Sequence, residues 1–467
     1  MLLYFIIVVL LLSFILLSPK RWMVNGFISL FYLTQAGFAL KCAFCDFNAT
    51  SAQIFTFDSV GVLFFSLLSV VSVYVCVHAA HYIEEKNLRA YKIYNALIIA
   101  LCTAIGGVYF ANHLAVTWIF LELTSICTAA LIYFRGNKQA LEATWKYIFV
   151  CSLGIAVAYL GVLLASSAAT HGELSYVNLS KEIASANPLY MKLAFLFMLV
   201  GYSSKMEVFP LYTAGIDANS SVPSPISGLL STGLVNAGFV AIFRMYKIMA
   251  ASEVFSWCSN VLIVTGVVSL VLAAFFMRRT NNYKRFLSYS TMENMGIVLI
   301  GLGVGGLGVY AALVHVAAHT FIKCALMLQI ARIGKSFGNY RINRIGDCMS
   351  YSSLWAWSMS LGMLAILAFP PSPLFFTELM ILREIISGGQ WWLLVVITLL
   401  VCIVIYSFAD HILNLCYKKT RNKPKTDVNK KPILTWSILL LFGAVLVFGL
   451  VWAGEFHEFI LDIAKFN

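Results

Sequence analysis

The chain has 467 residues, of which 61% are hydrophobic and only 11% are charged. This composition lies far outside the range of soluble domains, so it excludes a soluble enzyme and indicates a protein embedded in lipid. In such a chain the net charge of +12 reports on orientation in the membrane and does not indicate nucleic-acid binding.

Apolar runs of about 20 residues recur along nearly the whole sequence, and each can cross about 30 Å of hydrocarbon. The runs are continuous rather than alternating, which favours helices over a β-barrel. The first run lacks a preceding basic segment and a small-residue cleavage site, so we interpret it as a retained span. We therefore predict an all-α integral membrane fold with about fourteen transmembrane helices. They lie near residues 2–17, 22–40, 54–77, 95–112, 114–134, 145–168, 189–213, 222–245, 254–277, 289–309, 310–331, 353–386, 391–416 and 433–453.

Lysine and arginine are unevenly distributed between the loops on the two sides of these spans. If the spans alternate in direction, most of the 32 basic residues fall on one side. By the positive-inside rule that side is cytoplasmic and both termini face outward, in a bacterial or archaeal cytoplasmic membrane. The basic segments are 20–21, 86–92, 135–138, 278–285, 332–344 and 418–431.

Two proline-containing segments interrupt the predicted spans. Lys205 precedes the first, at Pro210 and VPSPIS (222–227), and Glu378 follows the second, FPPSP (369–373). Proline inside a span breaks the helix, and paired breaks in two halves are typical of inverted repeats with a functional site at the breaks. We predict repeats at 91–250 and 251–416, between N-terminal helices at 1–90 and a basic loop with a C-terminal helix at 417–467.

Ionisable residues within the predicted spans give the main functional signal. A single one is readily explained by a structural ion pair or by a side chain that reaches the interface. A set of both signs, spread over several helices, is typical of an ion or proton route. The set comprises Glu122, Lys146, Lys205, Glu207, Glu293, His315, His319, Lys323 and Glu378.

Glu122 and Lys205 are predicted to form a switchable pair, because each charge favours the ionised form of the other. Moving the carboxylate away would release the proton of the lysine. Glu207 is excluded as the partner of Lys205, since two residues along a regular helix are about 200° apart.

His315, His319 and Lys323 are spaced by four and form one polar stripe on an apolar helix. We interpret the stripe as a proton relay, because histidine and desolvated lysine both exchange protons near neutral pH. A metal site and purely structural hydrogen bonding are the alternatives. Two histidines without a carboxylate in the motif support a metal poorly.

No cofactor motif is visible. CAFC (42–45) offers two of the four ligands that an Fe–S cluster or a structural zinc site needs. GLGVGGLG (301–308) lies in an apolar region and favours close helix packing. We expect no cofactor, metal or redox centre in this chain.

Three segments make the chain resemble the antiporter-like proton-translocating subunits of respiratory complex I, and most strongly component F of hydrogenase-4-type complexes. They are ALEATWKYIFVCSLGIAVAYLGVLL (140–164), YKRFLSYSTMENMGIVLIGLG (283–303) and LVHVAAHTFIKCALM (313–327). The resemblance extends over roughly residues 90–450. It implies inverted repeats and outward termini.

The same resemblance implies roles for individual residues. Glu122 would pair with Lys205, His319 and Lys323 would form a relay, and Glu378 would be the terminal group at the second break. Glu293, before the MG pair, fits the hydrogenase-type pattern.

The chain also departs from the family. Asn236 stands where complex I subunits often have lysine. After Pro210, YTAGIDANSSVPSP keeps Asp217 and PSP but lacks the usual tryptophan, proline and histidine, and Glu207 replaces a small residue.

We therefore predict a proton-translocating membrane subunit of a multi-subunit respiratory or hydrogenase-type oxidoreductase, with sodium as the alternative ion. Its partners would be the lipid bilayer, other membrane subunits and peripheral redox subunits holding Fe–S, nickel–iron or quinone. A cation/proton antiporter subunit without a redox partner and an uncoupled assembly scaffold stay open as alternatives. The proton-translocation residues would be Glu122, Lys205, Lys323, His319, Glu378, His315 and Glu293.

Overall fold

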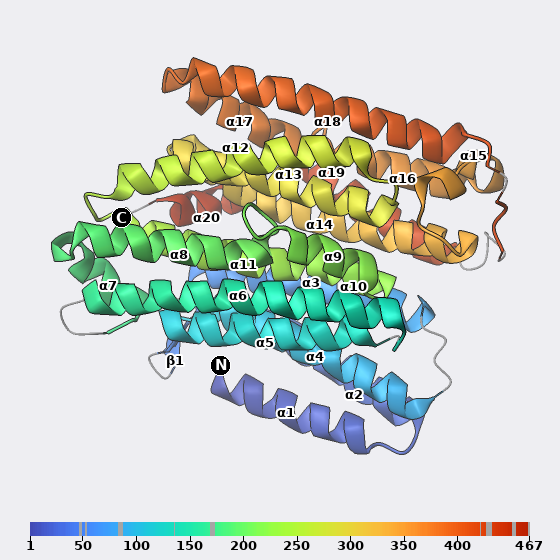
Figure 1. Ribbon diagram of the computed structural model, residues 1–467. Coiled ribbons are helices and arrows are strands. Elements are labelled where there is room, and N and C mark those ends of the chain that lie inside the picture. Colours follow the sequence, from blue (N-terminus) through green and yellow to red (C-terminus); the bar gives the residue numbers. More distant parts are fainter. Residues whose placement is uncertain are drawn as a thin grey trace.

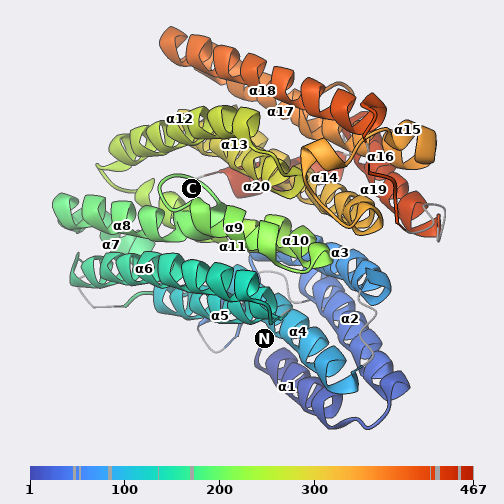
Figure 2. The same ribbon diagram turned by 45° about the vertical axis from the view of Figure 1, so that its right-hand side comes forward.

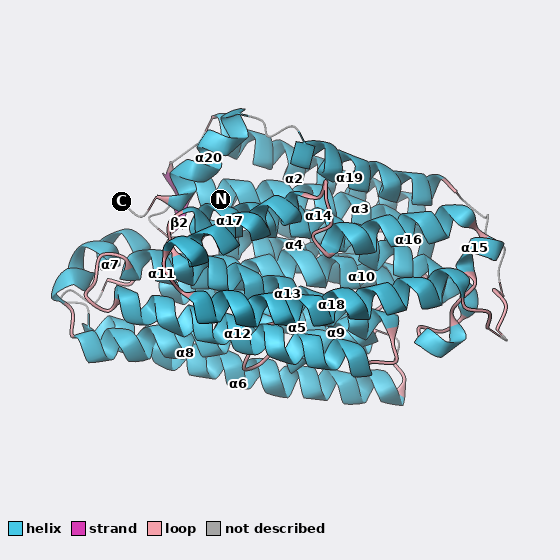
Figure 3. Ribbon diagram, turned by 90° about the horizontal axis from the view of Figure 1, so that it is seen from above, coloured by secondary structure: helices cyan, strands magenta, loops and turns pink. Residues whose placement is uncertain are grey.

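A computed structural model describes residues 1–465 except 46–48, 52–53, 83–86, 135, 169–172, 421, 426–431 and 451–453. The described chain is almost entirely helical, with one short antiparallel pair formed by β1 and β2 (Figure 3). Parts of the predicted basic loops, including Lys86, Arg135, Arg421 and all of 426–431, lie outside the described residues.

The elements follow in chain order. They are α1 (Leu2–Leu17), α2 (Arg21–Phe44), β1 (Thr50–Ser51), β2 (Phe55–Thr56), α3 (Ser59–Tyr82), α4 (Leu88–Phe110), α5 (Leu114–Tyr133), α6 (Lys138–Ala168), α7 (Tyr176–Glu182), η1 (Ile183–Ser185), α8 (Pro188–Met206), α9 (Thr213–Ser221), α10 (Ser224–Leu229), η2 (Leu230–Leu234), α11 (Val235–Met249), α12 (Phe255–Arg279), α13 (Tyr283–Val304), α14 (Leu307–Phe337), η3 (Ile342–Arg344), α15 (Cys348–Tyr351), α16 (Ser353–Ile366), α17 (Pro373–Ser387), α18 (Trp391–Tyr417), α19 (Ile433–Leu450) and α20 (Gly454–Ala464).

The multi-span helical class is confirmed. Among the described residues, 9 helices are long and apolar enough to cross a membrane, and shorter apolar helices lie at Leu2–Leu17, Ser353–Ile366 and Ile433–Gly449. Each span predicted from the sequence contains a helix. Both predicted interruptions are present, because α8 ends at Met206 before α9 begins, and α16 ends at Ile366 before α17 begins.

The long helices run side by side, with α7 at one end of the bundle and α15 at the other (Figures 1 and 3). The α5–α6 pair lies on one flank and α17–α18 on the opposite flank (Figure 2). Between the flanks, the apolar window of the α10–η2–α11 segment is 100% buried and that of α14 is 94% buried. These central helices are therefore surrounded by protein and connect the two flanks.

The first break keeps its backbone groups hydrogen-bonded without a helix. Glu207 has a φ of 61° and ends α8, because a left-handed residue turns the chain out of the helix. Beyond it, the amide of Phe209 donates to Ser269 Oγ at 3.0 Å and that of Leu211 donates to Ser203 Oγ at 3.2 Å. Irregular backbone at membrane depth is tolerated where protein satisfies it in this way.

Close packing of α6 on α8 positions this break. A Cβ at Gly201 would lie 2.4 Å from the carbonyl oxygen of Gly154, so the two backbones touch where both residues are glycine. Small residues permit this approach between membrane helices. The contact fixes the last turn of α8, which carries Lys205, against α6.

Candidate functional site

Lys205 lies at the end of α8 and is only 1% exposed. Its Nζ donates to Ser125 Oγ at 2.7 Å and lies 3.4 Å from the hydroxyl of Tyr147 on α6. Ser125 Oγ in turn donates to Glu122 Oε2 at 3.2 Å. Lys205, Ser125 and Glu122 therefore form a hydrogen-bonded chain from the break to α5.

This geometry changes the predicted pairing in one respect. Glu122 and Lys205 are brought into one cluster, but the hydroxyl of Ser125 lies between their charged groups. Because a hydroxyl can accept from one group and donate to the next, it can pass a proton between the two. We refer to Glu122, Ser125, Tyr147 and Lys205 as the first cluster.

Glu122 is half-buried and lies at the edge of the protein. It lines an apolar groove of about 390 Å³ between α5 and α6, together with Ile126, Trp145 and Ile148. The first cluster therefore extends from the interior at Lys205 to the α5–α6 flank.

Lys323 is the centre of a second cluster, formed by α13 and α14. It is fully buried, and its Nζ donates to the carbonyl oxygen of Leu287 and to Ser290 Oγ, both on α13. Its ammonium also interacts electrostatically with Glu293 and Glu207. A buried lysine with two carboxylates nearby has the opposite charges that a membrane interior requires.

His315 links α13 to the second break. Its Nε2 lies 3.0 Å from Asn294 Oδ1, and its Nδ1 lies 2.9 Å from Thr377 Oγ1 on α17. Asn294 Nδ2 donates to Glu293 Oε2 at 2.5 Å. The second cluster thus comprises Glu293, Asn294, His315, Lys323 and Thr377.

Glu378, the residue after Thr377, is half-buried. It lines a cavity of about 200 Å³ between α13, α17 and α18, with Ile297, Ile381 and Val401 among the other lining residues. Its carboxyl interacts electrostatically with that of Glu293. The second cluster therefore reaches the α17–α18 flank, opposite the flank where Glu122 lies.

Not every predicted residue joins these clusters. His319 is buried on the same face of α14, yet neither ring nitrogen has a hydrogen-bond partner among the described residues. Lys146 is not buried at all. It points outward from α6 and pairs with Glu142 at 2.5 Å, with side-chain exposures of 61% and 66%.

Glu207 does not pair with Lys205, as the sequence predicted, but the regular helix on which that prediction was based does not continue to Glu207. The chain leaves the helix at Glu207, so helical spacing does not set the direction of its side chain. Its Oε1 accepts from Asn219 Nδ2 on α9 at 2.7 Å.

Sequence reasoning missed the neutral members of the clusters. Ser125 lies three residues after Glu122, so helical spacing alone could have placed them on one face. Asn294 directly follows Glu293, and Thr377 directly precedes Glu378. Nothing in the sequence around Tyr147 indicated that its hydroxyl would lie beside Lys205.

Metal ligation has no support in the geometry of the described residues. Among them, no three histidine, cysteine, aspartate or glutamate side chains gather closely enough to hold an ion. The chemistry that the two clusters offer is the exchange and electrostatic control of protons on amines, imidazoles and carboxyls.

Known proteins share both sequence and fold with this chain. Residues 111–404 match the family described as NADH:quinone oxidoreductase/Mrp antiporter, transmembrane. A hydrogenase-4 component F homolog of Methylacidiphilum infernorum is 29% identical over 316 residues, which span 66% of each chain.

Two solved structures show the same fold. A subunit of the archaeal membrane-bound sulfane sulfur reductase superposes with a TM-score of 0.88 at 20% identity, covering 100% of this chain and 97% of the other. A subunit of the Mrp complex of Dietzia sp. superposes with a TM-score of 0.84 at 15% identity, covering 99% and 96%.

Proposed function

Because the chain belongs to the NADH:quinone oxidoreductase/Mrp antiporter transmembrane family, we propose that it is the proton-translocating membrane subunit of a hydrogenase-type or respiratory oxidoreductase complex. Electron transfer in partner subunits would drive protons through the two clusters. The alternative ion is sodium.

The observation that carries this proposal is the environment of Lys205. A lysine 1% exposed at a helix break, joined through one hydroxyl to a carboxylate, is a costly arrangement in a membrane interior. Its charge can be changed by moving one partner. Such a residue suits a switch, whereas the exposed ion pair of Lys146 with Glu142 on α6 lacks this property.

The arrangement of the breaks supports two inverted repeats. The break after α8 and the break between α16 and α17 each stand beside one cluster, as expected when corresponding helices of two repeats are interrupted. We assign about fourteen crossings on this basis, with the repeats at 91–250 and 251–416. The termini would lie outside a bacterial or archaeal cytoplasmic membrane.

The two flanks are the proposed contacts with partner membrane subunits. Each presents a half-buried carboxyl, Glu122 or Glu378, at an apolar surface. A carboxyl facing lipid alone would be unfavourable, whereas a neighbouring subunit could supply a polar partner. Fe–S, nickel–iron or quinone groups would be held by other subunits, and this chain would hold none.

Purification of the chain from its native membrane in mild detergent tests this proposal. We expect peripheral redox subunits to co-purify. In phospholipid vesicles, the electron donor of those subunits should then generate a pH gradient that a protonophore abolishes. Cation-driven proton exchange without any electron donor, and without redox subunits in the preparation, would instead establish a cation/proton antiporter.

A further inference from the structure

Glu207 is the buried carboxylate that neither cluster uses. It is 2% exposed, and its Oε2 has no hydrogen-bond donor among the described residues. Leaving a buried polar atom unpaired costs about 1–3 kcal/mol, and more for a charged group. A carboxyl at this position therefore needs a compensating interaction.

The segment that follows the break is shaped to hold this side chain. A Cβ at Gly215 on α9 would lie 2.3 Å from Cγ of Glu207, so only glycine leaves room for it. Asn219, one turn further along α9, donates to Oε1 at 2.7 Å. Helix α9 thus accommodates Glu207 in two ways: Gly215 leaves space for its side chain, and Asn219 donates a hydrogen bond to it.

Helix α9 is in turn fixed to α13. Asp217 forms an ion pair with Arg285, and Lys284 Nζ donates to the carbonyl oxygen of Val222 at 3.1 Å. Since α13 also carries Glu293 and the two acceptors of Lys323, the support of Glu207 is continuous with the second cluster.

The basic group that interacts electrostatically with Glu207 is Lys323 of the second cluster. Lys323 interacts electrostatically with both Glu207 and Glu293, and His319 is a further neighbour of Lys323. Lys205 precedes Glu207 by two residues, but its ammonium is bonded to Ser125 in the first cluster. Lys205 therefore belongs to the first cluster, whereas Glu207 interacts electrostatically with Lys323 of the second cluster.

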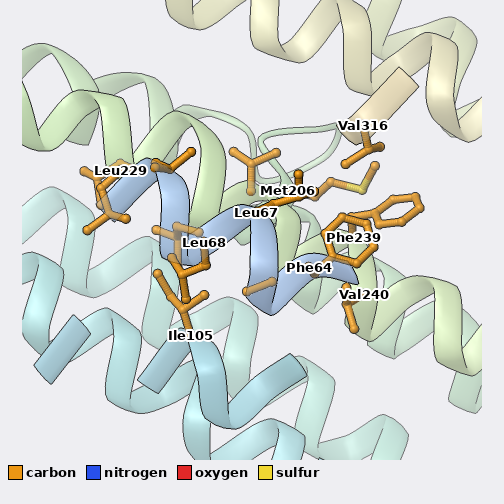
Figure 4. Close-up of a cluster of buried hydrophobic side chains, with 14 of the residues drawn as sticks. Phe64, Leu67, Leu68, Ile105, Met206, Leu229, Phe239, Val240 and Val316 are labelled. Carbon is orange, nitrogen blue, oxygen red and sulfur yellow. The ribbon is translucent and has the colours of Figure 1, made fainter. Parts of the chain in front are cut away.

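The residue between these two in the sequence, Met206, is apolar. Met206 lies beside Phe239 of α11 and Val316 of α14, within the buried hydrophobic core (Figure 4). Apolar side chains provide no donors or acceptors for proton transfer. Met206 therefore cannot relay a proton between the break and Lys323.

We propose that Glu207 is a proton-binding site whose protonation is coupled to that of Lys323, an inference that rests on the proposed function. Among the described residues the two side chains are not hydrogen-bonded to each other, since Lys323 Nζ donates to Leu287 and Ser290 and Glu207 accepts from Asn219. A proton that leaves the ammonium of Lys323 therefore reaches the carboxylate of Glu207 through an intervening water, leaving a neutral amine and a carboxylic acid. The reverse step restores the two opposite charges. Both charges vanish or appear together, so no unpaired charge is left in the low-dielectric interior.

The position of Glu207 gives this exchange a further consequence. Glu207 is the residue at which α8 ends, so the charge of its carboxyl lies next to the last turn of α8, which holds Lys205. We expect a change in the charge of Glu207 to act on the conformation of this turn, which lies beside the first cluster.

Infrared difference spectroscopy of the purified complex, titrated with pH in H2O and D2O, tests the proposal. We expect a carboxylic acid C=O band that shifts in D2O, disappears in Glu207→Gln and changes frequency in Glu207→Asp. Glu142→Gln, which removes an exposed carboxylate from α6, should leave the band unchanged. A band unaffected by both Glu207 variants would overturn the proposal, and Glu207→Asp decides the matter if Glu207→Gln does not accumulate.

Proton translocation in vesicles gives the second readout. Glu207→Gln should lower the protons moved per electron-donor turnover at least about tenfold, whereas Glu207→Asp should retain most of the activity. Wild-type translocation in the glutamine variant would contradict the proposal. Absence of translocation in the wild type would contradict the proposed function instead, while the infrared band would still decide the role of Glu207.

Discussion

Lys205 and Ser125 are 2.7 Å apart, and this hydrogen bond connects the broken helix to the carboxylate of Glu122 on α5. The lysine and the carboxylate of the proposed switch are therefore connected through a neutral hydroxyl. Any change in the orientation of Ser125 alters the interaction of both charged groups at once.

Replacement of Ser125 by alanine should lower proton translocation several-fold while the complex still assembles. Removing the hydroxyl leaves the Lys205 ammonium short of an acceptor, at a cost of about 1.5–3 kcal/mol. Ser125→Thr should retain activity because it keeps the hydroxyl. The measurement is the initial rate of vesicle acidification per donor turnover.

The control for this change is Ser167→Ala on α6, where an exposed hydroxyl donates only to the backbone of its own helix. It should leave translocation unaltered. Equal rates for Ser125→Ala and wild type would mean that the hydroxyl is not part of the route.

Replacement of Asn294 by alanine should separate Glu293 from His315. The amide contacts both groups, so the variant loses the polar connection from Glu293 to His315, while the contact of His315 with Thr377 on α17 stays. We expect a several-fold loss of translocation and a loss of stability of about 1–3 kcal/mol. Vesicle acidification and thermal unfolding in detergent measure the two effects.

Asn414→Ala provides the comparison, since the amide of Asn414 bonds to an exposed aspartate on α18. If both asparagine variants translocate protons equally well, the link through His315 carries no proton.

Valine at Gly201 should destabilise the protein through overpacking. The new side chain would meet the backbone of Gly154, 2.4 Å from the position of its Cβ, at the crossing of α6 and α8. Overpacking costs about 1–3 kcal/mol, and here it would also displace Lys205. We expect a lower yield of assembled complex and a lower thermal midpoint.

Gly37→Val on α2 is the matched substitution, because nothing lies within 4 Å of a Cβ there. A thermal midpoint for Gly201→Val as high as that of Gly37→Val would show that the crossing is looser than the structure indicates.

Arg244 allows stability to be separated from translocation. This side chain on α11 is 7% exposed and bonds to Asp58 at 2.7 Å and to the carbonyl oxygen of Tyr109 at 2.7 Å. Arg244→Met should lower stability by about 1.5–3 kcal/mol through loss of charged hydrogen bonds. Translocation per assembled complex should stay near wild type, because neither cluster contains Arg244.

Arg341→Met is the control, because the side chain of Arg341 is exposed. Its thermal midpoint should match that of the wild type. A large loss of translocation in assembled Arg244→Met would place a third functional group at this end of α11.

The helical membrane fold followed readily from the sequence, because long apolar runs and interrupting prolines are local signals. Pro210 and the FPPSP segment marked both breaks, and the spacing of His315 and Lys323 placed them on one buried face. Lys205 and Glu122 were also recognised as one unit. These features depend on side chains within a few residues of each other or on the cost of charge in lipid.

The features that the sequence did not reveal depend on tertiary contacts. Lys146 looked like a buried charge, yet its helix turns that face outward and pairs it with Glu142. The direction of Glu207 depended on the backbone turn that ends α8, and helical geometry could not supply it. The role of Asn219 as its donor required α9 to fold back beside the break.

Proton translocation by the Lys205→Ala variant tests the central claim most directly. The complex is reconstituted in phospholipid vesicles, and the protons moved per donor turnover are compared with wild type and with Lys146→Ala, which removes an exposed lysine from α6. We predict that Lys146→Ala behaves as wild type and that Lys205→Ala assembles but moves almost no protons. Full translocation by Lys205→Ala would contradict the account.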